Sequence, residues 1–132
     1  MSKTLAAVLG TGQTKYVAKR KDVTMNGLVR EAIDRALSDA GATMADIDAV
    51  VVGKAPDFFE GVMMPELFMA DATGATNKPL IRVHTAGSVG GSTAIVAASL
   101  VKSGKYRRVL TMAWEKQSES NAMWALSIPV PF

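Results

Sequence analysis

An uncharged stretch, residues 85–101, most constrains what this chain folds into. A turn of small residues, Thr85–Gly91, is followed by ten residues, Ser92–Val101, that fit a helix. A helix that is apolar or small on every side must be buried. The segment before the turn, Leu80–His84, predicts a strand with Ile81 and Val83 on one side and Arg82 and His84 on the other. The sequence therefore predicts a buried central helix. Its amino end carries Ser88 and free backbone N–H groups, which favour negative charge.

The rest of the chain alternates short apolar runs with helical patterns. Thr24 and Gly41 fit the two caps of a helix between them. The order strand–helix repeated, ending in a strand, predicts one domain over residues 1–132. We expect a layered α/β fold of βαβαβαβ type with a largely parallel sheet. The other predicted elements are strands at Leu5–Leu9, Ala49–Gly53 and Arg108–Ala113 and a helix from Pro65 to Gly74.

The composition excludes several classes of function. The chain has no cysteine and one histidine, so neither thiolate catalysis nor a transition-metal site is expected. A net charge of +3 with only 6% aromatic residues argues against a nucleic-acid partner. Residues 1–4 begin no apolar signal segment, and no run is long enough to span a membrane. We therefore expect a cytoplasmic protein.

The end of the chain, residues 115–132, predicts an extended tail. It begins polar and becomes apolar from Asn121 to Phe132. An exposed apolar segment of this length is unusual. We expect either a partner chain or further sequence to cover it.

Several ordered motifs resemble the amino-terminal half of the thiolase superfamily, and its sterol-carrier and lipid-transfer branch in particular. The turn Ser88–Ala94 resembles the nucleophile turn of that branch, with Ser88 at the position of the cysteine and Gly90 in place of a Ser or Thr. The other matching motifs are Val8–Thr14, Ala36–Gly41, Asp46–Gly53, Ser103–Gly104 and Trp114–Ser118.

This resemblance implies a thiolase-like acyltransferase that takes a coenzyme A thioester as substrate and binds no cofactor covalently. It implies lipid or sterol side-chain metabolism, as in steroid degradation, a homodimer or higher homo-oligomer, and a small OB-fold acyl-CoA-binding partner. The family's second half, with its His and second Cys, is not in these 132 residues. We therefore expect this chain alone to be inactive. Two alternatives stay open: a subunit of a retro-aldolase-type sterol side-chain acyl-CoA lyase, or a non-catalytic lipid-transfer or assembly module.

Ser88 is the candidate catalytic residue. It is a nucleophile, a hydroxyl that lines the acyl site, or only a helix N-cap. His84, four residues earlier, either forms a dyad with Ser88 or is structural. Glu115 either lines the site or forms a surface ion pair. A complete hydrolase with a G-x-S-x-G turn is excluded, because no histidine follows Ser88. The other candidate substrate-binding residues are Gly87, Val89, Gly90 and Gly91.

Two basic groups and one apolar group have two interpretations each. The basic loop Lys15–Lys21 and a second group after the central helix either contact coenzyme A phosphates or are simply solvated. An apolar group either contacts an acyl chain or belongs to the core or a subunit interface. The second basic group is Lys102, Lys105, Arg107 and Arg108, and the apolar group is Phe58, Phe59, Met63, Met64, Phe68 and Met69.

Overall fold

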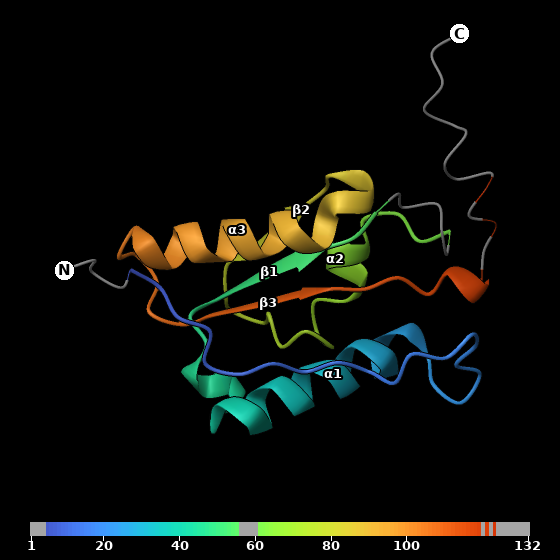
Figure 1. Cartoon of the computed structure of the whole chain (residues 1–132), viewed down its shortest axis with the longest axis horizontal. Helices are drawn as coiled ribbons and strands as arrows, with labels where there is room; N and C mark the ends of the chain where they lie inside the picture. The colour runs from blue at the N-terminus through green and yellow to red at the C-terminus, as the bar shows by residue number, and fades with distance from the viewer. Residues whose placement is uncertain (1–4, 56–60, 120, 122, 124–132) are drawn as a thin grey trace, which may run out of the picture.

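A computed structural model of the chain describes residues 5–55, 61–119, 121 and 123 (Figure 1). The sheet of this described part has three parallel strands: β1 (Ala49–Gly53), β2 (Leu80–Val83) and β3 (Val109–Ala113). Their order is β2-β1-β3, so β1 lies in the centre. The predicted α/β class with a parallel sheet is confirmed, and β1 has the predicted bounds.

The first long helix, α1 (Met25–Ala40), begins and ends where its caps predict. The Thr24 hydroxyl accepts a hydrogen bond from the Gly27 N–H at 3.1 Å, and Gly41 has the left-handed φ of 58°. Such caps satisfy backbone groups that the helix itself leaves unpaired. The side of α1 that packs on the sheet is apolar and buried, with Leu28, Val29, Ile33 and Leu37.

The sheet is covered by different helices on its two faces. Val50 and Val52 of β1 pack with Ile33 of α1 and with Met69, which ends α2 (Pro65–Phe68). On the opposite face, Gly53 lies against α3 (Val89–Lys102). Figure 1 shows α3 and α1 on the two sides of the sheet. Three short 3-10 helices complete the described elements: Met44–Asp46, Ala86–Ser88 and Gln117–Glu119. The predicted helix from Pro65 to Gly74 is shorter than expected, since turns follow Phe68.

The central helix α3 is buried on one side only by the described residues. Val89, Thr93 and Ala97 face the sheet and are buried. Ile95, on the other side, has 69% of its surface exposed. Burial on all sides, as the sequence predicted, is therefore wrong for the described part of the chain. The apolar pattern of α3 indicates that both of its sides should be covered. The described residues cover only the side that packs on the sheet.

The predicted strand Leu5–Leu9 is not part of the sheet that the described residues form. Val8 has 81% of its surface exposed, and the segment continues along α1 (Figure 1). The physical reason is close backbone contact: a Cβ on Gly10 would lie 2.5 Å from the Ala40 nitrogen, and one on Gly12 would collide with the Ala32 carbonyl. Glycine at these two positions allows the segment to lie directly on α1, and the βαβαβαβ order lacks its first strand in the described part of the chain.

The amino ends of β1 and β3 are joined by an aspartate. The Asp48 carboxylate accepts hydrogen bonds from the backbone N–H groups of Arg107 and Arg108 at 2.7 and 2.9 Å. Arg108 also forms an ion pair with Asp46 at 3.0 Å. These contacts fix the start of β3 against the start of β1.

Several predictions fall on residues outside the described ranges. Phe58, Phe59 and the segment 124–132 are among them, so the predicted tail is described only over its first part. Within the described ranges, every helix is too short or too polar to cross a membrane.

Candidate functional site

The carboxyl ends of the three parallel strands form one edge of the sheet, and most of the predicted site residues lie there. Lys54 follows β1, His84 and the turn to Ser88 follow β2, and Glu115 lies two residues after β3. The chain leaving β1 goes to α2 on one face, whereas the chain leaving β2 goes to α3 on the other. In open parallel sheets, ligands bind in the crevice where connections diverge in this way. In the strand order β2-β1-β3, this point lies between the carboxyl ends of β1 and β3.

The turn at Ser88 is held by its own hydroxyl groups. The Ser88 hydroxyl donates to the Thr85 carbonyl at 2.8 Å, and the Thr85 hydroxyl donates to Ser92 Oγ at 2.8 Å. Ser88 occupies the N-cap position of α3, but its side chain does not cap the helix. Because its proton points to Thr85, Ser88 forms no dyad with His84 in this structure. Ala86, two residues earlier, has a φ of 48°.

The space in front of this turn is open. A Cβ built on Gly87, Gly90 or Gly91 meets no described atom within 4 Å, and all three residues are exposed. Their small size is therefore not required by packing within the described chain. Val89 alone in this turn is buried, and it fixes the turn on the sheet. No side chain caps the first N–H groups of α3. The Ser88 N–H donates to the Thr85 carbonyl at 3.2 Å and the Val89 N–H donates to the Ala86 carbonyl, so the N–H groups that remain for an acceptor from outside are those of Gly90 and Gly91.

Glu115 lies in a different part of the edge, across β1 from the turn. Neighbouring strands are about 4.8 Å apart, so the ends of β2 and β3 are separated by roughly 10 Å. One Glu115 oxygen is 2.8 Å from the Lys54 ammonium, and the other accepts the Ala55 N–H at 2.6 Å. Lys54 is fully buried. Glu115 is therefore neither brought together with Ser88 nor a simple surface ion pair.

Two concave regions adjoin β3. A cavity of about 210 Å³ lies beside Glu115, between the end of β3, α1 and the segment 12–14. A larger apolar groove of about 700 Å³ follows β3 between α1, α3 and the N-terminal segment. The second volume is within the range of small-molecule sites.

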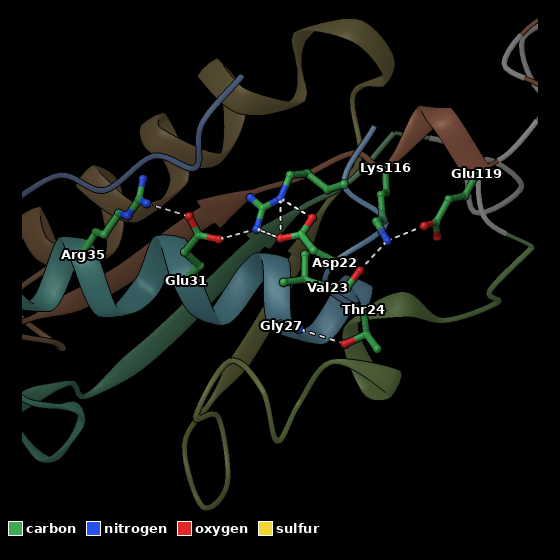
Figure 2. Close-up of polar contacts among 9 residues, drawn as sticks. Asp22, Val23, Thr24, Gly27, Glu31, Arg35, Lys116 and Glu119 are labelled. Carbon is green, nitrogen blue, oxygen red and sulfur yellow. Dashed lines mark hydrogen bonds and ion pairs between the residues drawn. The ribbon is translucent and has the colours of Figure 1, made fainter. Parts of the chain in front are cut away.

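The basic loop Lys15–Lys21 lies at the same end of the molecule as the carboxyl edge (Figure 1). Figure 2 shows how its base is held: Arg20 pairs with Asp22 and with Glu31, both at 2.9 Å. These carboxylates raise the pKa of Arg20, and the guanidinium lowers the pKa of Asp22. The buried Lys116 ammonium donates to the Val23 carbonyl at 2.8 Å and also pairs with Glu119. The lysines of the loop are exposed beyond this base: Lys15, Lys19 and Lys21.

The second basic group does not share that location. Arg107 and Arg108 precede β3, and Lys102 ends α3, so this group lies at the amino edge of the sheet. A five-residue strand spans about 17 Å. The two basic groups therefore lie at opposite edges of the sheet, and the contact of either group with coenzyme A phosphates stays a prediction.

The apolar group divides between core and surface. Met69 is fully buried, whereas Met63, Met64 and Phe68 are more than half exposed.

Two residues of the site were missed by sequence reasoning: Lys54 and Ala86. A signal for Lys54 exists, because a lysine directly after a buried strand and a glutamate after a parallel one reach the same edge. Ala86 gave no signal, since alanine is not typical of left-handed backbone. Among the described residues, no three His, Asp or Glu side chains gather to hold a metal ion.

Comparisons with known proteins agree with this fold. Residues 6–128 match the family described as thiolase, N-terminal domain. The acetyl-CoA acetyltransferase of Methanothermobacter thermautotrophicus (strain Delta H) is 34% identical over 115 residues, which cover 86% of this chain and 30% of that protein.

Two solved structures of condensing enzymes are also similar. The priming β-ketosynthase from the R1128 polyketide biosynthetic pathway has 32% identity and a TM-score of 0.62, over 74% of this chain and 29% of that one. The 3-oxoacyl-(acyl-carrier-protein) synthase III from Aquifex aeolicus VF5 has a TM-score of 0.63 over 76% of this chain and 32% of that one. At 22% identity, the second shows likeness of fold alone. The chain spans about a third of the length of these proteins.

Proposed function

Because this chain belongs to the thiolase family, whose N-terminal domain it matches over residues 6–128, we propose that it is part of an acyltransferase acting on acyl-CoA thioesters. The observation that carries the proposal is the open turn at the amino end of α3, where Gly87, Gly90 and Gly91 leave room for a ligand. A thioester carbonyl oxygen placed there accepts hydrogen bonds from the N–H groups of Gly90 and Gly91, which no side chain caps. Preorganised donors of this kind stabilise the negative charge that develops on the oxygen during acyl transfer.

Ser88, which we place at the cysteine position of the family, holds the thioester in this proposal and does not attack it. A serine hydroxyl needs a general base to become a nucleophile. Here its proton is donated to the Thr85 carbonyl, not to His84. The proposed substrate-binding residues are therefore those of the turn Gly87–Gly91, with His84 just before it. Glu115 lies at the same edge of the sheet, where it holds Lys54 and the Ala55 N–H and does not contact the substrate.

Retro-aldol cleavage is the second candidate function, and the lack of any cysteine favours it. In that reaction the hydroxyl of a β-hydroxyacyl thioester loses its proton to a base and becomes the carbonyl of the released aldehyde or ketone. The carbon–carbon bond breaks, and its electron pair moves onto the thioester as an enolate, which then takes up a proton. The negative charge again develops on the thioester oxygen, so the same N–H groups stabilise it. This chemistry needs no acyl-enzyme intermediate.

We propose a lipid or sterol side-chain acyl group as the substrate, within steroid or other lipid degradation in the cytoplasm. The apolar groove beside β3, lined by residues such as Ala36, Ala97 and Val109, favours a hydrocarbon ligand. A homo-oligomer and a small OB-fold acyl-CoA-binding partner are the proposed partners. The exposed side of α3 supports an assembly of some kind, and it equally supports the alternative of a non-catalytic lipid-transfer or assembly module.

Calorimetry with the dethia analogue of acetyl-CoA, in which CH₂ replaces the thioester sulfur, tests the acyl-CoA site. We expect the purified chain to bind the analogue and Gly91→Val to lower the affinity at least about tenfold, since the valine fills the open space without clashing. Ser99→Val adds similar bulk at an exposed position near the other end of α3 and is the matched control. Absence of binding by the unmodified chain, or equal binding by Gly91→Val, would contradict the proposal.

A further inference from the structure

A lysine is buried at the carboxyl edge of the sheet, directly after the last residue of the central strand β1. Lys54 follows Gly53, the last residue of β1, and its side chain has no exposed surface. Its ammonium lies 2.8 Å from one oxygen of Glu115, which is 22% exposed. The second Glu115 oxygen accepts the N–H of Ala55 at 2.6 Å. One carboxylate thus holds a side chain and a backbone group of the segment that leaves β1.

Stability alone does not explain this pair. Moving two charges out of water has a large cost, and their attraction in the interior often only compensates for it. Two apolar side chains of similar size would serve the fold as well. The pair does have one effect that apolar residues lack, since it fixes the distance and direction between the ends of two strands.

That geometry is transmitted to the turn before α3 through Gly53. A Cβ on Gly53 would collide with the Thr93 hydroxyl and would lie 3.0 Å from a methyl group of Val89. The backbone of β1 and the first turns of α3 are therefore in direct contact. Val89 is the buried residue between the exposed Ser88 and Gly90. A shift of residues 53–55 must move Val89 and with it the N–H groups on either side.

We propose that Lys54 and Glu115 are positioning residues for the N–H groups of the turn Gly87–Gly91, an inference that rests on the proposed acyl-CoA site. Glu115 acts as a fixed acceptor and not as a proton-transfer group, because both of its oxygens are engaged. Neither residue contacts the thioester. Their action on the turn passes through Gly53 and Val89.

The test compares the unmodified chain with the double variant Lys54→Met/Glu115→Gln, which removes both charges and keeps the side-chain volumes. The exposed α1 pair is removed in the control Arg30→Met/Asp34→Asn. Urea unfolding shows that the variants remain folded. Amide NMR shifts of Gly87–Gly91 then report the turn directly, and calorimetry with the dethia acetyl-CoA analogue reports binding.

We expect the Lys54→Met/Glu115→Gln variant to unfold cooperatively at a urea midpoint near that of the unmodified chain. Its turn amide shifts should change and its affinity should fall about tenfold or more, while the control changes neither. Unchanged turn amide shifts in the folded double variant would overturn the inference, whether or not the analogue binds. If the double variant does not fold, the amide NMR shifts of Gly87–Gly91 are measured in the single variant Glu115→Gln instead. Failure of the unmodified chain to bind overturns the proposed function instead, because the amide shifts do not depend on a ligand.

Discussion

Ala86 is the residue whose backbone differs most from what its type prefers within the turn before α3. Its φ of 48° lies in the left-handed region, which costs a non-glycine residue about 1–2 kcal/mol. Such conformations persist where the surroundings determine them, and they are concentrated at functional sites. Here the conformation directs the chain from β2 into the 3-10 turn Ala86–Ser88. Strain is thus located two residues before the candidate serine.

Ala86→Gly is expected to raise the free energy of unfolding, by up to about 1 kcal/mol, because glycine adopts this φ without strain. The gain is smaller than the strain, since glycine also increases the entropy of the unfolded chain. Ala94→Gly, on the exposed side of α3, is the matched control and should lower stability by about 0.5–1 kcal/mol. Urea unfolding of both variants measures the difference. Equal losses in the two variants would show that Ala86 is not strained.

At the scale of elements, the amino ends of β1 and β3 depend on charge. Asp48 accepts two N–H bonds from Arg107 and Arg108, which lower its pKa below the usual 3.8. The pKa of Asp46 is also lowered, chiefly by hydrogen bonds from Thr43. A carboxylate whose pKa is lower in the folded state stabilises the fold fully above its unfolded pKa. That contribution is lost as the pH falls through the folded pKa.

The stability of the chain should therefore decrease as the pH falls below about 4. Asp48→Asn should lower stability at pH 7 and make the decrease below pH 4 less steep, because a neutral acceptor remains at every pH. Urea midpoints measured from about pH 7 to 2 check this expectation. Asp71→Asn, an exposed side chain between α2 and β2, is the control. A pH profile of Asp48→Asn parallel to that of the unmodified chain would contradict the proposed role of the strand-end hydrogen bonds.

The elements that the sequence predicted well are those with local signals. Thr24 and Gly41 cap α1, and the apolar run of β1 between Asp48 and Lys54 admits little else. The prediction of a strand at Leu5–Leu9 was wrong because tertiary packing decides whether this segment lies on α1 or pairs with β3. Periodicity contains no information about that choice. The contact between Lys54 and Glu115 joins residues 61 positions apart, so no local pattern predicts it, and only the parallel order of β1 and β3 brings the two residues to one edge.

At the scale of the whole molecule, the turn Gly87–Gly91 is open to a ligand, but the described residues place no general base beside Ser88. The described residues bring no base to Ser88, and the only histidine, His84, is not its acceptor. The chain also spans 30% of the acetyl-CoA acetyltransferase that it matches. In the proposed function, the turn, the Lys54–Glu115 pair and the basic loop are parts of a site to which other groups must contribute for turnover.

The purified chain is expected to show no thiolysis of acetoacetyl-CoA, because neither a cysteine nor an activated serine is present to take the acyl group. An assay that follows acetyl-CoA formation by chromatography, with an active acetyl-CoA acetyltransferase as positive control, measures this. Robust formation of acetyl-CoA that survives Ser88→Ala would show that another group acts. Robust formation that Ser88→Ala abolishes would establish the serine as nucleophile.

The central place of β1 has a consequence for synthesis on the ribosome. Val51 pairs with Ile81 on one side and with Thr111 on the other, so the second partner is translated about 60 residues after β1. At roughly 5–20 residues per second, one edge of β1 waits about 3–12 s for β3. During that interval a hydrophobic strand edge is open to wrong pairing in the nascent chain. Binding of chaperones to the nascent chain should therefore be greatest after β2 has left the ribosome and before β3 pairs with β1.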